Sequence, residues 1–143
     1  MIKEQLYNKT VDILVQAYFN DTLIHGNCAS CAVGNIVAHN MGYTYTSDKK
    51  FWECSIPNWY DVFRAYQKYE GKAKKQIDST GYTWQELAKV EKAFESAGKG
   101  NSGDDYMFNG LMAVIDVLDI IHENTDEKAT TETKKRFVKQ QPA

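Results

Sequence analysis

Apolar residues recur at helical spacing along most of this chain, and the pattern predicts an all-α protein. Over residues 3–23 the apolar stripe around Leu14 widens until the second half of the segment is apolar nearly all round. A second long stripe covers residues 104–123 and includes Leu111 and Leu118. These two helices are therefore expected to form the core of the protein.

Three further helices are expected between these two. One is predicted to run for about a dozen residues from Asn27, a residue type that suits an N-cap, to His39. Another covers residues 59–69, where aromatic and aliphatic residues recur at helical spacing. The last begins after Thr83, because Thr83 and Glu86 have the spacing of a capping box. The predicted fold is a compact single-domain bundle of about five helices.

The segments between and after these helices lack helical periodicity. Residues 43–58 are predicted to form a long aromatic loop between the second and third helices, and Gly71 with the lysines after it a connector. The helical domain is expected to cover residues 1–124, because residues 125–143 are polar and rich in Thr, Lys and Glu. That last stretch is predicted to be a flexible tail or a short surface helix. Its candidate apolar anchors are Phe137 and Val138.

The composition limits the function. With 143 residues, of which 43% are hydrophobic, the chain can bury the core of one domain without disulfides or a metal. Its 17 basic and 19 acidic residues are spread along the sequence, which disfavours general nucleic-acid binding. The first residues are charged and lack the apolar stretch of a secretory signal, and no window reaches the length of a membrane span. A cytoplasmic protein without membrane contact is therefore expected.

The cysteines carry the most distinctive chemistry of the chain. Cys28 and Cys31 stand close together with His25 just before them, and Cys54 lies in the predicted aromatic loop. If Cys54 folds back, these four residues supply the three sulfur ligands and one nitrogen ligand that structural zinc favours. A single Cys-x-x-Cys pair is weaker evidence than a doubled one. The cofactor prediction is accordingly either zinc or none.

Two other interpretations of the cysteines remain open. A helix N-terminus favours the thiolate of a cysteine, so Cys28 with His25 as its base is the candidate pair of a cysteine-dependent enzyme. Alternatively, the thiols pack in the core as small hydrophobic side chains. On the predicted helix one stripe, separate from an aliphatic face, contains Cys28, Cys31, Asn35 and His39.

The densest run of aromatic residues, between residues 43 and 69, is the first choice for a binding surface. Tyr and Trp anchor interfaces and cap ligand pockets, and lysines beside them suit a nucleotide or a protein. The expected partner is a protein or a small anionic ligand, and apolar helix faces also allow a homo-oligomer. The predicted binding residues are Tyr43, Tyr45, Lys49, Lys50, Trp52 and Trp59.

Acidic residues and a histidine follow one another near the end of the predicted helix over residues 104–123. Asp119 and His122 have the i, i+3 spacing found in di-metal helical bundles, and Asp116 stands one turn before them. No second motif of this kind occurs on another predicted helix. These residues are therefore expected to form a solvated stripe.

Parts of the sequence resemble small helical proteins from Bacteroidetes and their phages, over Asn27–Asn35, Tyr82–Glu95 and Gly110–Leu118. The resemblance implies no known activity. Small phage-type proteins are often binders that inhibit or sequester host components, so it favours a non-enzymatic binding or accessory protein. The cysteine cluster would then be structural or bind zinc, and the cysteine-dependent enzyme is the alternative.

Overall fold

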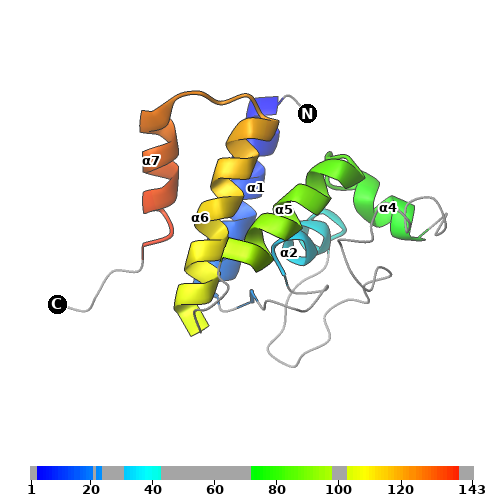
Figure 1. Ribbon diagram of the computed structural model, residues 1–143. Coiled ribbons are helices and arrows are strands. Elements are labelled where there is room, and N and C mark those ends of the chain that lie inside the picture. The colour runs from blue at the N-terminus through cyan, green and yellow to red at the C-terminus, as the bar shows by residue number, and fades with distance from the viewer. Residues whose placement is uncertain (1–2, 21, 24–30, 43–71, 98–102, 139–143) are drawn as a thin grey trace.

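The computed structural model describes residues 3–20, 22–23, 31–42, 72–97 and 103–138 (Figure 1). In these ranges the protein is all-α, as the sequence predicts, and has no strand. The predicted loop over residues 43–58 and the predicted helix over residues 59–69 lie outside them. The described helices are α1 (Lys3–Phe19), α2 (Ala32–Asn40), α4 (Lys72–Asp78), α5 (Trp84–Ala97), α6 (Gly103–Ile121) and α7 (Glu127–Lys135).

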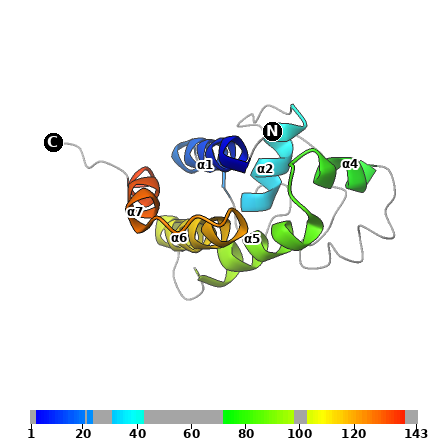
Figure 2. The same ribbon diagram turned by 90° about the horizontal axis from the view of Figure 1, so that it is seen from above.

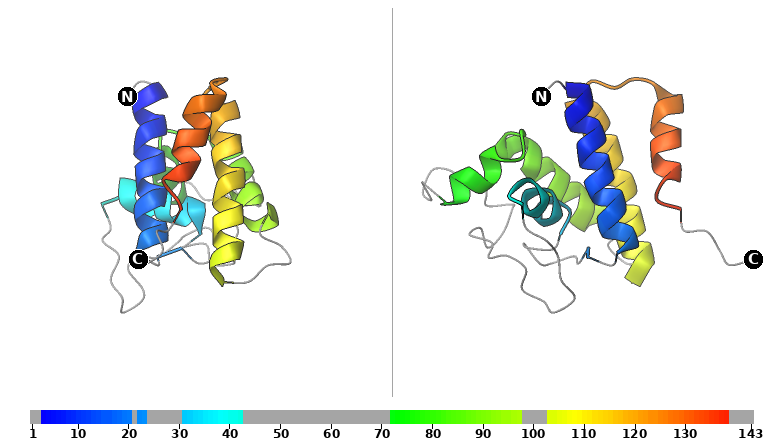
Figure 3. Two further views of the ribbon diagram at one scale, coloured as in Figure 1. Left: turned by 90° about the vertical axis from the view of Figure 1, so that its left-hand side faces the viewer. Right: turned by 180° about the vertical axis from the view of Figure 1, so that it is seen from behind.

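Three helices stand side by side and two others cross them. Helices α1, α6 and α7 are upright in Figure 1, whereas α5 and α2 run across the molecule. Seen from above, α7 and α4 lie at opposite ends (Figure 2). Figure 3 shows α7 lying over the seam between α1 and α6. The most extensive interface between the described helices joins α5 to α6.

The core is built from the apolar faces of α1, α2, α5 and α6. Leu14, Ile36 and Phe94 are completely buried on three of these helices. On α6, Leu111 and Leu118 are buried as well. Helices α1 and α6 are core elements, as the sequence predicts, but α2 and α5 belong to the core equally: Ala32–Ala38 of α2 are all buried, and α5 forms the most extensive interface with α6.

The backbones of α5 and α6 approach each other very closely at Gly110. A Cβ atom built on Gly110 would lie 2.5 Å from the backbone carbonyl oxygen of Phe94 and 2.9 Å from its ring. A distance of this kind leaves no room for any side chain. Glycine at this position therefore sets how closely the two helices pack.

Helix α2 differs from the prediction. It begins at Ala32, and Cys31 is its N-cap, with an extended backbone and a sulfur that accepts a hydrogen bond from the Gly34 N–H at 3.3 Å. Every residue from Ala32 to Ala38 is buried, so Asn35 of the predicted polar stripe lies inside the protein like the aliphatic face, whereas His39 is exposed. Asn35 lies inside because its side-chain amide donates to the carbonyl oxygens of Thr22 and Cys31.

The predicted connector after Gly71 is also wrong, because it forms helix α4. Two residues near the end of this lysine-rich segment pack inside the protein, since Gln76 and Ile77 are completely buried. Tertiary contact therefore outweighs the polar composition of the segment. Gly81, with a φ of 81°, turns the chain from α4 toward α5.

The start of α5 confirms the predicted capping box. The Glu86 N–H donates to the Thr83 hydroxyl at 3.2 Å, and the Thr83 N–H donates to the Glu86 carboxylate at 2.8 Å. Helix α6 begins and ends within two residues of its prediction. Its end is followed by Glu123, whose left-handed φ of 57° turns the chain toward α7.

Of the two predictions for the stretch after residue 124, the short surface helix is the one that the structure confirms, as helix α7. Asp126 caps its N-terminus by accepting from the N–H groups of Lys128 and Ala129, and no residue of the helix is buried. Ion pairs of 2.8 Å attach it to its neighbours, from Lys134 to Asp116 on α6 and from Arg136 to Asp12 on α1.

The apolar anchor of α7 follows the helix. Phe137 is completely buried, and its ring centroid lies 6.2 Å from that of Tyr18. Val138, the other predicted anchor, is 56% exposed. Exposed ion pairs contribute about 0–1 kcal/mol each, so Phe137 supplies most of the docking energy of α7.

None of the described helices combines the length and the apolar character needed to span a membrane.

We expect Gly110→Ala to lower the free energy of unfolding by about 1–3 kcal/mol, because the new Cβ would overlap the Phe94 carbonyl. At an exposed position of a helix, exchange of glycine for alanine raises the free energy of unfolding by about 0.5–1 kcal/mol. The sign of the change in this free energy therefore distinguishes the two situations. Urea unfolding followed by circular dichroism measures it. An unchanged or increased stability would mean that α5 and α6 do not approach as closely as described.

Phe137→Ala should destabilise the protein by about 3–5 kcal/mol, because it empties the aromatic site beside Tyr18. Val138→Ala is the matched control on the next residue and should change the stability by less than about 0.5 kcal/mol. Hydrogen exchange should show faster exchange of the α7 amides in the Phe137 variant alone. Equal effects of both substitutions would contradict the assignment of Phe137 as the anchor.

Candidate functional site

Most of the binding residues predicted from the sequence lie outside the described residues. This holds for the whole aromatic surface and for three members of the cysteine cluster, so their roles stay predictions. Cys31 is the member of the cluster that the structure describes. The residues outside are Tyr43, Tyr45, Lys49, Lys50, Trp52, Trp59, His25, Cys28 and Cys54.

Cys31 lies in a setting that favours the neutral thiol. Burial raises the pKa of the Cys31 thiol well above its ordinary value, and the nearby Glu91 carboxyl raises it further. A zinc ligand or a catalytic nucleophile has to be a thiolate, and the residues predicted to act with Cys31 in either role lie outside the described residues, so both roles stay predictions. Within the described ranges, no group of three or more His, Cys, Asp and Glu residues is placed to hold a metal ion.

Glu91 on α5 is a buried acid packed against the start of α2. Its side chain is 6% exposed, and Oε2 has no hydrogen-bond partner. Desolvation raises the pKa of Glu91 from its ordinary 4.5 to about 7; a hydrogen bond with the Cys31 thiol opposes this shift, and Glu95 adds to it. Glu91 therefore changes charge near neutral pH inside the core.

The stability of the protein should fall as pH rises from about 4.5 through about 7, because folded Glu91 holds its proton to a higher pH than unfolded Glu91 does. Above this window the loss reaches about 3 kcal/mol at most. Glu91→Gln cannot ionise and should therefore be more stable than the wild type at about pH 8, with little difference below pH 4.5. Urea unfolding at several pH values measures this difference.

The exposed Glu132→Gln is the control and should give a difference from the wild type that varies little with pH. If Glu91→Gln also differs from the wild type by the same amount at every pH, the carboxyl of Glu91 is not desolvated as described.

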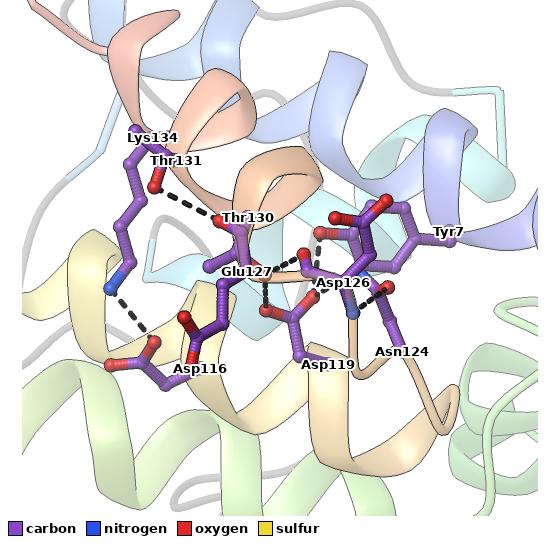
Figure 4. Close-up of polar contacts among 9 residues, drawn as sticks. All are labelled: Tyr7, Asp116, Asp119, Asn124, Asp126, Glu127, Thr130, Thr131 and Lys134. Carbon is purple, nitrogen blue, oxygen red and sulfur yellow. Dashed lines mark hydrogen bonds and ion pairs between the residues drawn. The ribbon is translucent and has the colours of Figure 1, made fainter.

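The solvated stripe that the sequence predicts at the acidic end of α6 is confirmed for Asp116, which is exposed, and is wrong for Asp119. Asp119 is 8% exposed and accepts three hydrogen bonds from neutral donors, as Figure 4 shows. Tyr7 donates to Oδ1 at 2.8 Å, the Asn124 amide donates to the same oxygen at 3.1 Å, and Thr130 donates to Oδ2 at 2.5 Å. The correction has a physical cause: α7 folds back over α6 and removes Asp119 from water.

His122, one turn further along, belongs to a second chain of hydrogen bonds. Its Nε2 lies 2.8 Å from the Tyr82 hydroxyl, which in turn lies 2.8 Å from the Thr10 hydroxyl. The rings of Tyr7 and Tyr82 pack edge-on against the His122 ring, with centroids 5.3 and 5.5 Å away. These contacts fix the imidazole between α1 and the start of α5.

A polar pocket opens beside this network, between α1, α6 and α7. Its volume is about 470 Å³. Burial and the Asp119 carboxylate raise the pKa of Tyr7 to about 12, so its hydroxyl stays a neutral donor in the pocket wall. The lining residues are Glu4, Tyr7, Asn8, His122, Asn124, Ala129 and Thr133.

An apolar groove of about 600 Å³ lies on the outer side of the α5–α6 pair. The α6 wall is aliphatic, and Ile120 is 76% exposed there. The α5 wall is low, because its residues are mostly small, and it carries two lysines. The lining residues are Lys89, Lys92, Ala93, Ser96 and Ala97 from α5, and Ala113, Val117, Ile120 and Ile121 from α6.

The charged side chains that line this groove are all positive. Its lining contains no carboxylate, and neither Lys89 nor Lys92 forms an ion pair with another described residue. The sequence analysis missed this surface, because α6 is apolar on several sides and its pattern does not show which side α5 leaves uncovered. The signal available was the run Val117, Ile120 and Ile121, which extends the apolar surface of α6 beyond one face.

Comparison of the chain with protein-family models, with curated proteins and with solved structures found no match.

Proposed function

We propose that the chain is a non-enzymatic binding protein, and that the groove between α5 and α6 receives an acidic amphipathic helix of a partner protein. The observation that carries the proposal is the exposed aliphatic wall around Ile120, which faces two lysines without ion-pair partners. Isolated exposed apolar residues are common on protein surfaces. A continuous apolar groove with a polar rim is typical of an interaction site.

The shape of the groove supports a helix as its occupant. Ala93, Ser96 and Ala97 form a floor of small side chains, so bulky apolar side chains of a partner can enter between this floor and the α6 wall. An amphipathic helix presents such side chains at i, i+3, i+4 and i+7. The volume of about 600 Å³ suits the few anchors of one or two helical turns.

The lysines define the charge of the partner. Lys89 and Lys92 stand one turn apart on the rim, where carboxylates beside the apolar anchors of a partner helix can reach them. Charges on a rim add mainly to the association rate and to the choice of partner, whereas the apolar contact supplies the affinity. A basic helix should therefore be rejected from the same groove.

A second copy of this chain is a less suitable occupant. A stable dimer buries about 800 Å² on each partner, and a groove lined by nine residues, several of them alanine, falls short of that area. The aromatic segment around Trp52 and Trp59 stays a predicted further surface for the partner.

Titration of the ¹⁵N-labelled protein with a synthetic helix of about 14 residues tests the proposal. The helix carries leucines at i, i+3, i+4 and i+7 with glutamates beside them, and its counterpart carries lysines instead. The acidic helix should shift α5 and α6 amides that line the groove and bind at least about tenfold more tightly than the basic helix.

Substitutions identify the contacts. Ile120→Asp should weaken the acidic helix by about tenfold or more and leave the stability unchanged within about 0.5 kcal/mol, because the side chain is largely exposed. The double substitution Lys89→Glu with Lys92→Glu should reverse the preference between the two peptides, whereas Lys128→Glu on α7, outside the groove, should not.

The proposal fails if the acidic helix leaves the groove resonances unchanged, or if it binds the charge-reversed variant as tightly as the wild type. Concentration-dependent dimerisation that Ile120→Asp abolishes would instead assign the groove to a second copy.

A further inference from the structure

We propose that the polar pocket between α1, α6 and α7 binds a small organic cation through a primary ammonium group. The proposal is independent of the α5–α6 groove. It rests on the charge that surrounds the pocket, on the acceptors in its wall and on its aromatic side.

The charge around the pocket is negative. Asp119 accepts hydrogen bonds from Tyr7 and Asn124, which line the pocket, is almost completely buried, and has only neutral hydrogen-bond donors around it (Figure 4). No Lys or Arg of the described chain contacts it. A buried charge of this kind is little screened by water, so it acts on the neighbouring pocket.

Glu4 adds a second negative charge at the pocket itself, and the described lining contains neither lysine nor arginine. Two basic side chains of α7 are paired with carboxylates: Lys134 is bound to Asp116 at 2.8 Å and Lys135 to Glu132 at 3.4 Å. The field in the pocket therefore favours cations and opposes carboxylates and phosphates.

The pocket wall offers the partners that an ammonium group needs. An ammonium group has three N–H donors and no acceptor. Glu4 and Asn8, one helical turn apart on α1, and Thr133 on α7 supply oxygen acceptors on facing walls. Two helices thus present acceptors to a ligand group at the surface, where Glu4 and Asn8 are exposed.

Aromatic surface completes the site. Tyr7 and His122 both line the pocket, and their rings pack edge to face. The face of a tyrosine ring attracts a cation within about 6 Å. Its hydroxyl already donates to Asp119, which holds the ring in place. The volume of about 470 Å³ fits a small molecule rather than a peptide.

This inference differs from the small anionic ligand that the sequence predicts. The two surfaces select opposite charges, because the α5–α6 groove is lined by two lysines, whereas the polar pocket is lined by Glu4 with Asp119 close by. Ile121, the last residue of α6, lines the groove, and the next residue, His122, lines the pocket.

The test uses 1,4-diaminobutane as the cationic probe, with butane-1,4-diol as its neutral analogue and succinate as the anionic one. ¹⁵N-labelled protein is titrated with each. The diamine should shift the amides of the pocket residues, and the diol and succinate should leave them unchanged at the same concentrations. A diol or succinate that binds as well as the diamine would overturn the proposal, and so would the absence of any shift.

Two variants separate a site from general attraction to an acidic protein. Glu4→Gln should weaken the diamine by about tenfold, whereas Glu132→Gln removes the same charge from α7 outside the pocket and should have no effect. Ala129→Lys places an ammonium group in the pocket wall and should abolish binding while the protein stays folded. Equal weakening by Glu4→Gln and Glu132→Gln, or unchanged binding to Ala129→Lys, would overturn the proposal.

Discussion

The close approach of α5 to α6 at Gly110 is the constraint on which the rest of the structure depends. Because the Phe94 carbonyl lies where a Cβ of residue 110 would be, the two helices pack backbone against backbone at this point. Phe94 is thereby driven into the core beside Leu111 and Leu118. The same pair of helices also lines the groove, where the residues from α5 are mostly small and those from α6 are aliphatic.

Local signals in the sequence predicted the parts of the fold that local interactions determine. The capping box of Thr83 and Glu86 predicted the start of α5, and the long apolar stripe predicted α6. The predictions were wrong where contacts with segments distant in the sequence determine the local structure. The lysines before Gln76 suggested a connector, but the burial of that residue makes the segment helical, and Cys31 caps α2 four residues after the predicted start. Neither the burial of Gln76 nor the cap at Cys31 produces a periodic pattern of apolar residues in the sequence.

The candidate sites could be predicted only in part, for the same reason. The spacing of Asp119 and His122 was recognisable, but the burial of Asp119 depends on α7, which contacts it through Thr130. Helix α7 is anchored in turn by Phe137, seven residues further along the chain. The groove depends on which face of α6 is left uncovered by α5. The lining of the groove contains two lysines and that of the pocket one glutamate, so the two surfaces beside the end of α6 differ in charge.

Solvent relaxation of methyl groups tests most directly whether the α5–α6 pair leaves an open apolar groove. A soluble gadolinium chelate is added to methyl-labelled protein, and the relaxation of each methyl reports its exposure. The methyls of Ile120 should relax strongly, while those of Ile115 and Leu118 on the same helix should relax weakly, because Ile120 is 76% exposed and the other two are buried. If the Ile120 methyl is protected as well as that of Ile115, the groove is filled in the free protein and is not available to a partner.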